Sequence, residues 1–187
     1  RSLNKEEAAF FEGRKIIPRM NKLAIDAVAL VTNPDNPDTL LTYSQAENIF
    51  SGKIRSWKQL NPNSALDSIA IVFDNNGSSN SRYLQETFHL QKPLPSNWSA
   101  TNSNADVIDY VNKTPRALGV VSVNWISDRD DATVNSFLTK VKVVEISSAD
   151  TSLEKEYYKP YQAYIALKQY PFIRDVQIII REGRNSL

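Results

Sequence analysis

The sequence contains no cysteine, a single histidine and no long apolar run, and each absence excludes a class of function. Without cysteine there are no disulfides, no zinc–thiolate sites and no thiol nucleophile. Because His89 is the only histidine, the sequence excludes histidine clusters. A lone histidine is usually a packed or surface residue. Ser78, His89 and Asp106 are the components of a serine triad, but the G-x-S-x-G elbow is missing. We therefore expect neither catalysis nor a cofactor.

Charge and hydropathy exclude two further classes. The 22 basic and 21 acidic side chains nearly cancel, and no Lys/Arg-rich run occurs. This argues against a nucleic-acid partner and against a polybasic membrane anchor. No apolar stretch approaches the roughly 20 residues that span a bilayer, so we expect no transmembrane segment. Asp128, Asp130 and Asp131 lack the spacing of a calcium loop, which predicts a solvated loop and no metal.

The apolar pattern predicts strands that alternate with helices, which is typical of an α/β fold. The predicted helices cover residues 4–11, 44–50, 82–88 and 104–111, and Ser44 with Glu47 is expected to cap the second. The predicted strands cover residues 23–31, 69–73, 119–123, 142–146 and 161–167, with a strand or buried helix at 176–180. The first strand is expected to be covered on both faces. Asp26 interrupts it, so this carboxylate either has partners at a hinge or is solvated at a sheet edge.

One segment has the composition of an anion-binding loop. After the strand at 69–73 come Asn75, Asn76, Gly77, Ser78, Ser79, Asn80 and Ser81, and then a helix with Arg82 in its first turn. Small residues allow a ligand to approach the backbone, and the first N–H groups of a helix have no intrahelical acceptor. With the serine hydroxyls they form a site for phosphate, sulfate or a carboxylate. Serine and asparagine are also ordinary caps and turn formers, so composition leaves a structural role open.

Several stretches resemble the phosphate-binding receptors of ABC transporters. Residues 23–34 resemble that family's hinge strand and the turn after it. Residues 41–60 resemble its most recognisable signature: a Leu-Thr opening, a short helix ending in Ile-Phe, then Ser-Gly-Lys-Ile and a Trp. The strand into the Gly-Ser loop and residues 112–121, which lead into Gly-Val-Val, follow in the family's order. The resemblance covers about residues 1–180.

The resemblance implies a periplasmic-binding-protein-like, two-lobed α/β fold, with mixed sheets flanked by helices and a ligand in the cleft between lobes. Residues 1–22 would then be part of the first lobe, and residues 23–125 the second lobe, which carries the anion loop. Residues 126–187 would form a crossing segment and the return to the first lobe. The family has a further strand with its own anion loop before this region and another helix after it. On this resemblance we expect a chain truncated at both ends, with an incomplete first lobe.

The loop departs from the family's pattern. Members commonly have an arginine before an Asp/Ser-Gly-Ser-Gly-Thr loop, whereas Asp74 stands at that position here. Ser79 replaces the second glycine and Asn80 the threonine, so only Gly77 and Ser78 match. Losing the arginine removes a bidentate phosphate contact, and a carboxylate there repels an anion by about 1 to 4 kcal/mol at short range. Arg82 replaces the missing charge if its side chain folds back.

The resemblance implies a non-catalytic solute-binding protein of ABC-type phosphate transport, which binds phosphate or a similar oxyanion and delivers it to a membrane ABC permease. Its expected location is the periplasm or cell envelope, with a lipid anchor as a variant. The altered loop leaves an alternative: a diverged envelope sensory or interaction module of the same fold with a different ligand or none. A sheet edge left exposed by a missing strand predicts a homodimer.

Overall fold

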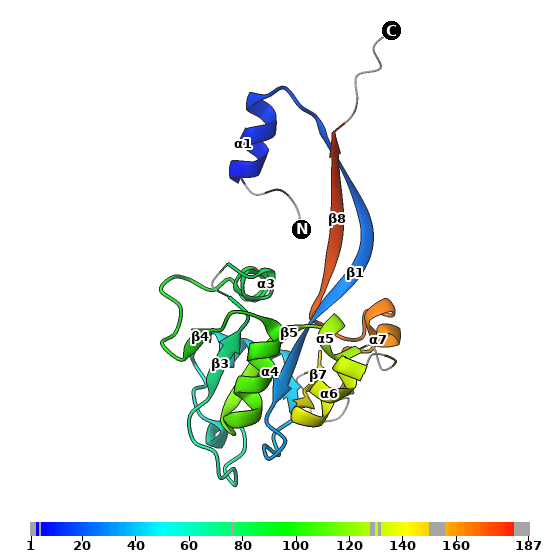
Figure 1. Ribbon diagram of the computed structural model, residues 1–187. Helices are drawn as coiled ribbons and strands as arrows, with labels where there is room; N and C mark the ends of the chain where they lie inside the picture. Colours follow the sequence, from blue (N-terminus) through cyan, green and yellow to red (C-terminus); the bar gives the residue numbers. More distant parts are fainter. Residues whose placement is uncertain are drawn as a thin grey trace. The chain divides into compact units, whose positions relative to one another are not determined.

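The computed structural model describes residue 3 and residues 5–75, 77–127, 130, 132–149 and 156–181 (Figure 1). The chain divides into two compact units. Unit 1 consists of Arg1–Asp26 and Arg174–Leu187, and unit 2 is the continuous stretch Ala27–Ile173. The chain therefore passes between the units twice, directly after Asp26 and directly after Ile173.

Unit 2 is built on a mixed sheet. The strand order is β4-β3-β5-β1-β6, and β8 also pairs with β1. The central pairs β3–β4 and β3–β5 are parallel, whereas β1 runs antiparallel to β5 and β6. The bounds are β1 Pro18–Thr32, β3 Ala70–Phe73, β4 Trp98–Ala100, β5 Ala117–Ser122, β6 Lys142–Val143 and β8 Ile173–Arg181. A separate parallel pair consists of β2 Leu40–Thr42 and β7 Glu145–Ser147.

Helices pack on this sheet (Figure 1). Those that contact it are α3 Ser79–Thr87, α4 Asn104–Lys113, α5 Asn124–Ser127 and α6 Ala132–Lys140. Helix α2 Tyr43–Phe50 contacts β2 of the separate pair, and the other helices of unit 2 are η1 Trp57–Gln59 and α7 Gln162–Ala166. Helix α4 lies against β5 and β3 because Val107, Ile108 and Val111 form one fully buried face. Gly119 of β5 permits this close approach, since a Cβ atom there would lie 2.7 Å from Val111 Cγ2.

An aromatic cluster fills the space beside the sheet. Phe50 of α2 stacks on Phe88 with ring centroids 5.7 Å apart, and Trp98 of β4 meets Phe50 edge-on at 5.6 Å. Phe172 contacts Phe88 from the other end of unit 2, at 5.8 Å. Such edge and offset contacts add to the burial energy of each ring. The cluster therefore packs the C-terminal end of unit 2 against α2 and β4.

Most predicted elements of unit 2 are confirmed, but two predictions are wrong. Residues 161–167 form helix α7 rather than a strand, with Tyr161 as the residue before its first turn. Residues 142–146 do not form one strand: β6 pairs with β1, and β7 pairs with β2 in the other sheet. The change of sheet occurs at Val144, whose N–H still donates to Leu30 O at 2.9 Å.

The start of α2 also differs from the prediction. Its N-cap is Thr42, whose Oγ1 accepts from Gln45 N at 3.2 Å, while Gln45 Oε1 accepts from Thr42 N at 2.9 Å. This is a capping box two residues before the predicted Ser44 and Glu47. The predicted helix is confirmed, and the residues that cap it are different.

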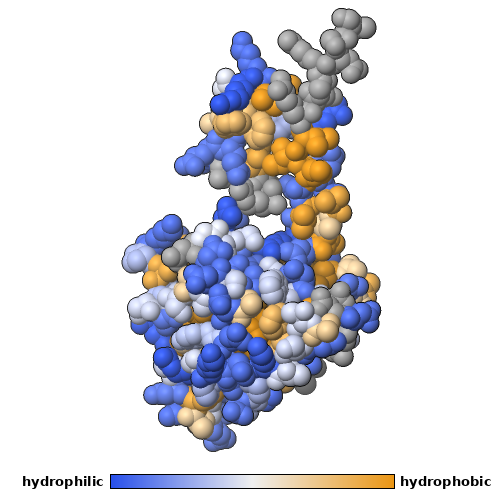
Figure 2. All heavy atoms as spheres, in the orientation of Figure 1, coloured by the Kyte–Doolittle hydropathy of each residue, from blue (hydrophilic) through white to orange (hydrophobic). Residues whose placement is uncertain are grey.

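Unit 1 consists of helix α1 Lys5–Gly13 and the distal parts of β1 and β8. Residues 176–180, for which the sequence allows a strand or a buried helix, form part of strand β8. The prediction that residues 23–31 are covered on both faces is wrong for the first part, because burial begins at Ala27 and Leu23 is 69% exposed. Figure 2 shows apolar side chains along the parts of β1 and β8 that belong to unit 1. The exposed ones include Ile17, Met20, Leu23, Val176, Ile178, Ile179 and Ile180.

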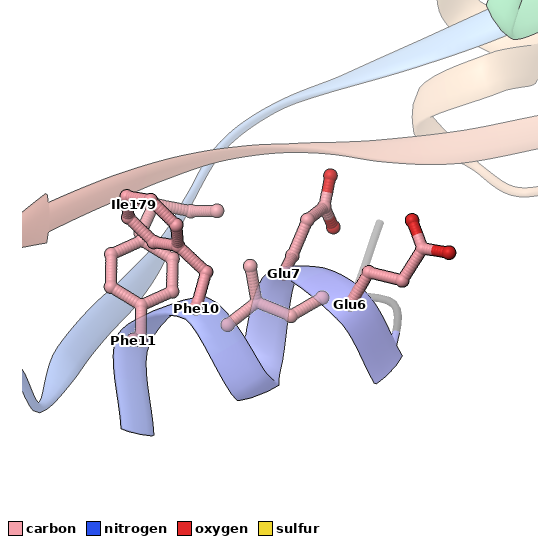
Figure 3. A pocket seen from close by; sticks show the side chains of 6 residues that line it. Glu6, Glu7, Phe10, Phe11 and Ile179 are labelled. Atoms are coloured by element: carbon pink, nitrogen blue, oxygen red, sulfur yellow. The ribbon is translucent and has the colours of Figure 1, made fainter. Parts of the chain in front are cut away.

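Helix α1 and β8 enclose an open apolar hollow of about 480 Å³ within unit 1. Phe10, Phe11 and Ile179 lie together on its wall, and Glu6 and Glu7 line its other end (Figure 3). Among the described residues, none of the helices has the length and apolar content needed to cross a bilayer.

Candidate functional site

The candidate loop begins where β3 ends. All four residues of β3 are buried, and the strand lies between its parallel neighbours β4 and β5. Asp74 follows β3 directly, and α3 begins at Ser79. In α/β sheets, ligands commonly bind outside the carboxyl ends of parallel strands, where strands lead into helix N-termini. The predicted loop therefore lies outside the carboxyl end of a parallel strand, where that strand leads into a helix N-terminus.

Local hydrogen bonds shape the loop. The Asn75 side chain accepts from Gly77 N at 3.0 Å, and Asn75 O accepts from Ser78 N at 3.0 Å. Ser78 is the N-cap of α3, with extended backbone angles, and its Oγ accepts from Ser81 N at 2.9 Å. Ser78 thereby satisfies one of the N–H groups that a helix start leaves without an intrahelical acceptor. Its structural role as a cap is real, and its oxygen already has a backbone donor.

The structure separates the predicted site residues by exposure. Those on the surface are Asn75, Gly77, Ser79 and Arg82, and those buried are Ser78, Asn80 and Ser81. Ser81 Oγ accepts from Gln85 Nε2 at 2.9 Å, so this hydroxyl is engaged within α3. Asn76 lies outside the described residues. A ligand at the loop therefore meets the backbone of Gly77 and the first turn of α3 before any buried side chain.

Gly77 has room beside it. A Cβ atom there would meet only Asn75 Oδ1, at an ordinary contact distance of 3.7 Å. The fold itself therefore does not require glycine at this position. A requirement for glycine, if measured, would come from a ligand that approaches the backbone.

A hydrogen-bonded polar cluster lies behind the loop. Asn104 Nδ2 donates to Asp74 Oδ2 at 3.3 Å, and Asn104 Oδ1 accepts from Ser122 N at 3.0 Å. Ser122 Oγ in turn pairs with Asn80 Oδ1 at 3.1 Å. The cluster joins the carboxyl ends of β3 and β5 to the first turns of α3 and α4. Two of its buried atoms, Asp74 Oδ1 and Asn80 Nδ2, have no hydrogen-bond partner.

Sequence reasoning did not include Asn104 and Ser122 in the site. Both occupy boundary positions, since Ser122 is the last residue of β5 and Asn104 the first of α4. A polar residue directly after a buried strand is the signal that identifies such positions. The sequence does not show that Asn104 pairs with Asp74, 30 positions before it, and with Ser122, 18 positions after it.

Arg82 does not contact the loop through its side chain. The side chain is exposed, and within the described ranges no hydrogen bond or ion pair of its guanidinium is present; its backbone N–H donates to Ser78 O at 3.1 Å. Its folding back over the loop stays a prediction. Asp74 is buried, with 9% of its surface exposed, so its carboxylate lies behind the loop rather than on its surface.

Two other residues singled out in the sequence have structural environments. Arg174 Nε and Nη2 both donate to Asp26 Oδ2, at 2.8 and 2.6 Å, and the two side chains are 18% and 25% exposed. Asp26 is thus partnered rather than simply solvated. His89 is exposed after the end of α3, with a positive φ of 50°. No cluster of three or more candidate metal ligands occurs among the residues that the structure describes.

Comparisons with known proteins agree with this fold. The PBP superfamily domain matches residues 1–187. The phosphate-binding protein PstS of Staphylococcus epidermidis is 26% identical over 132 residues, which cover 70% of this chain and 40% of that protein. PstS of Borreliella burgdorferi is 26% identical over 121 residues, covering 60% of this chain and 42% of that protein. The matched region thus spans about two fifths of the length of these curated relatives.

Solved structures show the same architecture. An ABC-type phosphate transport receptor from Vibrio cholerae superimposes with a TM-score of 0.72 and 25% identity, covering 100% of this chain and 66% of that one. A putative phosphate ABC transporter substrate-binding protein with bound phosphate from Clostridium perfringens gives 0.70 and 22%, with 97% and 64% covered. The predicted α/β fold of the periplasmic-binding-protein type is confirmed. The resemblance to phosphate-binding proteins is likewise confirmed, and the chain belongs to the PBP superfamily.

Proposed function

We propose that the protein is a solute-binding protein of ABC-type phosphate transport, which binds phosphate or a similar oxyanion at the β3–α3 loop without catalysis. The observation that carries the proposal is the loop itself. A buried parallel strand leads through the exposed Gly77 into the N-terminus of α3. Backbone N–H groups and the positive end of the helix dipole favour an anion at such a position. The names of the relatives support the same ligand.

The proposal extends to the rest of the transport system. The family implies two lobes that close over the ligand, with residues 1–22 in the first lobe, 23–125 in the second, and 126–187 returning to the first. It also implies export to the periplasm or cell envelope and delivery of the ligand to a membrane ABC permease. A homodimer through an exposed sheet edge is a separate proposal, which light scattering tests: a monomer at high concentration contradicts it.

Isothermal titration calorimetry with inorganic phosphate, and with sulfate as the comparison anion, tests the proposal. We expect selective phosphate binding by the folded protein and a loss of affinity in Gly77→Ala. Because an added Cβ meets only Asn75 Oδ1 at 3.7 Å, the variant should fold normally, and its lost affinity would come from the ligand. Gly13→Ala is the matched control, since a Cβ at Gly13 meets nothing within 4 Å. Equal phosphate affinity in wild type and Gly77→Ala contradicts a ligand at this loop.

Arg82 is tested in the same experiment. If its side chain folds onto the bound anion, Arg82→Ala lowers phosphate affinity by about tenfold, the cost of losing one charge-assisted hydrogen bond. Lys113→Ala is the control, because Lys113 is an exposed basic residue in the last turn of α4. Unchanged affinity in Arg82→Ala removes Arg82 from the site and leaves the backbone as the anion contact.

One observation favours a second function. Asp74 occupies the position at which related proteins commonly have an arginine, and its carboxylate is buried beside the loop. A diverged envelope sensory or interaction module, with another ligand or none, fits a loop that has lost its fixed positive charge. Absence of heat with both phosphate and sulfate, from protein shown to be folded by circular dichroism, would favour this second function.

A further inference from the structure

Hydrogen bonds fix the backbone at the two crossings between the units. In unit 2, Val28 N donates to Phe172 O at 2.9 Å. In unit 1, Arg174 Nε and Nη2 both donate to Asp26 Oδ2, at 2.8 and 2.6 Å. The side chains of Arg174 and Asp26 are 18% and 25% exposed, so water screens this ion pair only in part. Each crossing therefore has a hydrogen-bonded residue on either side of it.

Helix α3 contacts the second crossing through Tyr83. The Tyr83 hydroxyl donates to Ile173 O at 3.1 Å, and Ile173 is the last residue before this crossing. Tyr83 lies about one helical turn after Ser79, where α3 begins. The start of α3, which favours an anion, is thus separated from the backbone of the crossing by one turn of helix and one hydrogen bond.

A second tyrosine binds the same stretch of backbone without belonging to α3. Tyr170 is fully buried, and its hydroxyl donates to Val28 O at 2.8 Å. Burial first, and the nearby Tyr83 second, raise the pKa of Tyr170 well above its ordinary value, so Tyr170 is a neutral donor at neutral pH. Tyr170 therefore stabilises the crossing alone, whereas Tyr83 belongs both to the helix that starts at the loop and to the crossing.

We propose that Tyr83 is a positioning residue that couples anion binding at the β3–α3 loop to the two crossings between the units. This inference rests on the proposed function. An anion at the first turn of α3 restricts the motion of that turn, and the hydrogen bond from Tyr83 extends the restriction to Ile173 and to the adjoining pair of Arg174 with Asp26. By reciprocity, crossings that are held in place favour anion binding at the loop. Tyr83 acts through the helix, so it needs no contact with the ligand.

Amide hydrogen exchange with and without inorganic phosphate tests the coupling, because local exchange rates report how often a segment opens. In wild type we expect phosphate to slow exchange about tenfold in peptides that contain Val28 and Phe172–Arg174, and in Tyr83→Phe by about twofold or less. Phosphate is kept at about 100 times each protein's own dissociation constant, so that occupancy is equal. Peptides from α6 give the reference for overall stabilisation by the ligand.

The same coupling predicts a change of phosphate affinity, which calorimetry measures. Tyr83→Phe, which keeps the ring and removes only the hydroxyl, should bind phosphate about tenfold more weakly than wild type. Asp26→Asn weakens the ion pair at the crossings and leaves α3 intact, so it should lower phosphate affinity by about fivefold. If circular dichroism shows that Tyr83→Phe does not fold, Asp26→Asn still tests the coupling.

Two control variants separate coupling from a purely structural role. Tyr110→Phe makes the same change at a half-buried tyrosine of α4 and should keep both the affinity and the slowing of exchange. Tyr170→Phe removes a hydrogen bond at the crossing from a residue outside α3. It should lower the stability of the protein and keep the slowing of exchange by phosphate.

The outcomes distinguish the inference from the proposed function. Suppose that wild type binds phosphate. The role of Tyr83 is then overturned, and the receptor function stands, if phosphate does not slow exchange at the crossings or slows it equally in Tyr83→Phe. Wild-type affinity in Asp26→Asn, or loss of the slowing in Tyr170→Phe, overturns it as well. If wild type does not bind phosphate, the receptor function fails and this inference fails with it.

Discussion

Replacing Gly119 by alanine should destabilise unit 2 through overpacking. A Cβ at this position would lie 2.7 Å from Val111 Cγ2, 2.8 Å from Val31 Cγ2 and 3.0 Å from Val107 Cγ1. Carbon atoms in good contact are about 3.5 to 4.0 Å apart, so each neighbour must move by roughly 0.5 to 1 Å. Two of these valines belong to α4 and one to β1, and β-branched side chains have few alternative rotamers.

The expected cost follows from these contacts. Overpacking of a filled core typically costs about 1 to 3 kcal/mol, and alanine regains about 0.4 to 1 kcal/mol by restricting the unfolded chain. We expect a net loss of about 1 to 2 kcal/mol, which lowers the unfolding temperature by about 2 to 4 °C for each kcal/mol. Urea and thermal unfolding followed by tryptophan fluorescence measure it, since Trp57, Trp98 and Trp125 all lie in unit 2.

Gly77→Ala is the matched control for this measurement. The same substitution in the same unit meets only one atom, at 3.7 Å, so its stability should be unchanged or slightly higher. The reasoning is refuted if Gly119→Ala and Gly77→Ala unfold at the same urea concentration with the same slope. A stability loss confined to Gly119→Ala supports a close α4–β5 contact.

Three further predictions concern unit 2. Burial raises the pKa of the Tyr170 hydroxyl well above its ordinary value, and this hydroxyl donates to Val28 O at 2.8 Å; Tyr170→Phe should cost about 1 to 3 kcal/mol at neutral pH. The contribution of neutral Tyr170 is complete below about pH 10 and is lost as the pH rises toward the folded-state pKa, so urea titrations of the variant should show a shallower alkaline loss. Asn33 Nδ2 donates to the carbonyls of residues 111 and 112 at the end of α4, at 2.9 and 2.7 Å. Asn33→Ala should therefore lower the free energy of unfolding by about 1 to 3 kcal/mol, and an unchanged urea midpoint contradicts this prediction. The half-buried Lys140 lowers the pKa of Asp109 chiefly through a hydrogen bond. Because solvent still reaches both side chains, Lys140→Gln should change stability by less than about 1 kcal/mol, with a difference that shrinks in high salt.

Short-range sequence patterns predict the helices well where only one assignment of the apolar face or of the capping residues fits. Helix α4 was expected because Val107, Ile108 and Val111 share one face, and this face is buried. The cap of α2 was ambiguous because Thr42 with Gln45 and Ser44 with Glu47 both fit the same four-residue pattern. Only the backbone angles, set by how β2 enters the helix, decide between them.

The wrong strand at 161–167 has a clear cause. A short apolar run fits a strand and a helix equally well by periodicity. Ala163, Ala166 and Leu167 are strong helix formers, so local propensity was the better guide. The split of residues 142–146 between two sheets was not predictable, because it depends on partners in β1 and β2 that are distant in sequence.

The candidate site was predictable only in part. The order of strand, small residues and helix identified the loop from residue types alone. The hydrogen-bonded cluster of Asp74, Asn80, Asn104 and Ser122 joins four elements, and no local pattern connects them. Sequence reasoning placed Asp74 against the ligand, whereas its carboxylate is buried behind the loop. Side-chain direction at the end of a strand is set by packing, which the sequence does not reveal.

The two crossings between the units have a consequence for protein engineering. Because Ala27–Ile173 is one continuous stretch, it can be excised with a single cut at each end. Its ends lie next to each other: Val28 N donates to Phe172 O at 2.9 Å, and Tyr170 also bonds to Val28 O. A stretch with adjacent ends is suited to expression on its own, to joining of its ends by a short linker, and to insertion into a surface loop of a host protein. In a host protein without tryptophan, its three tryptophans would then report its folding independently.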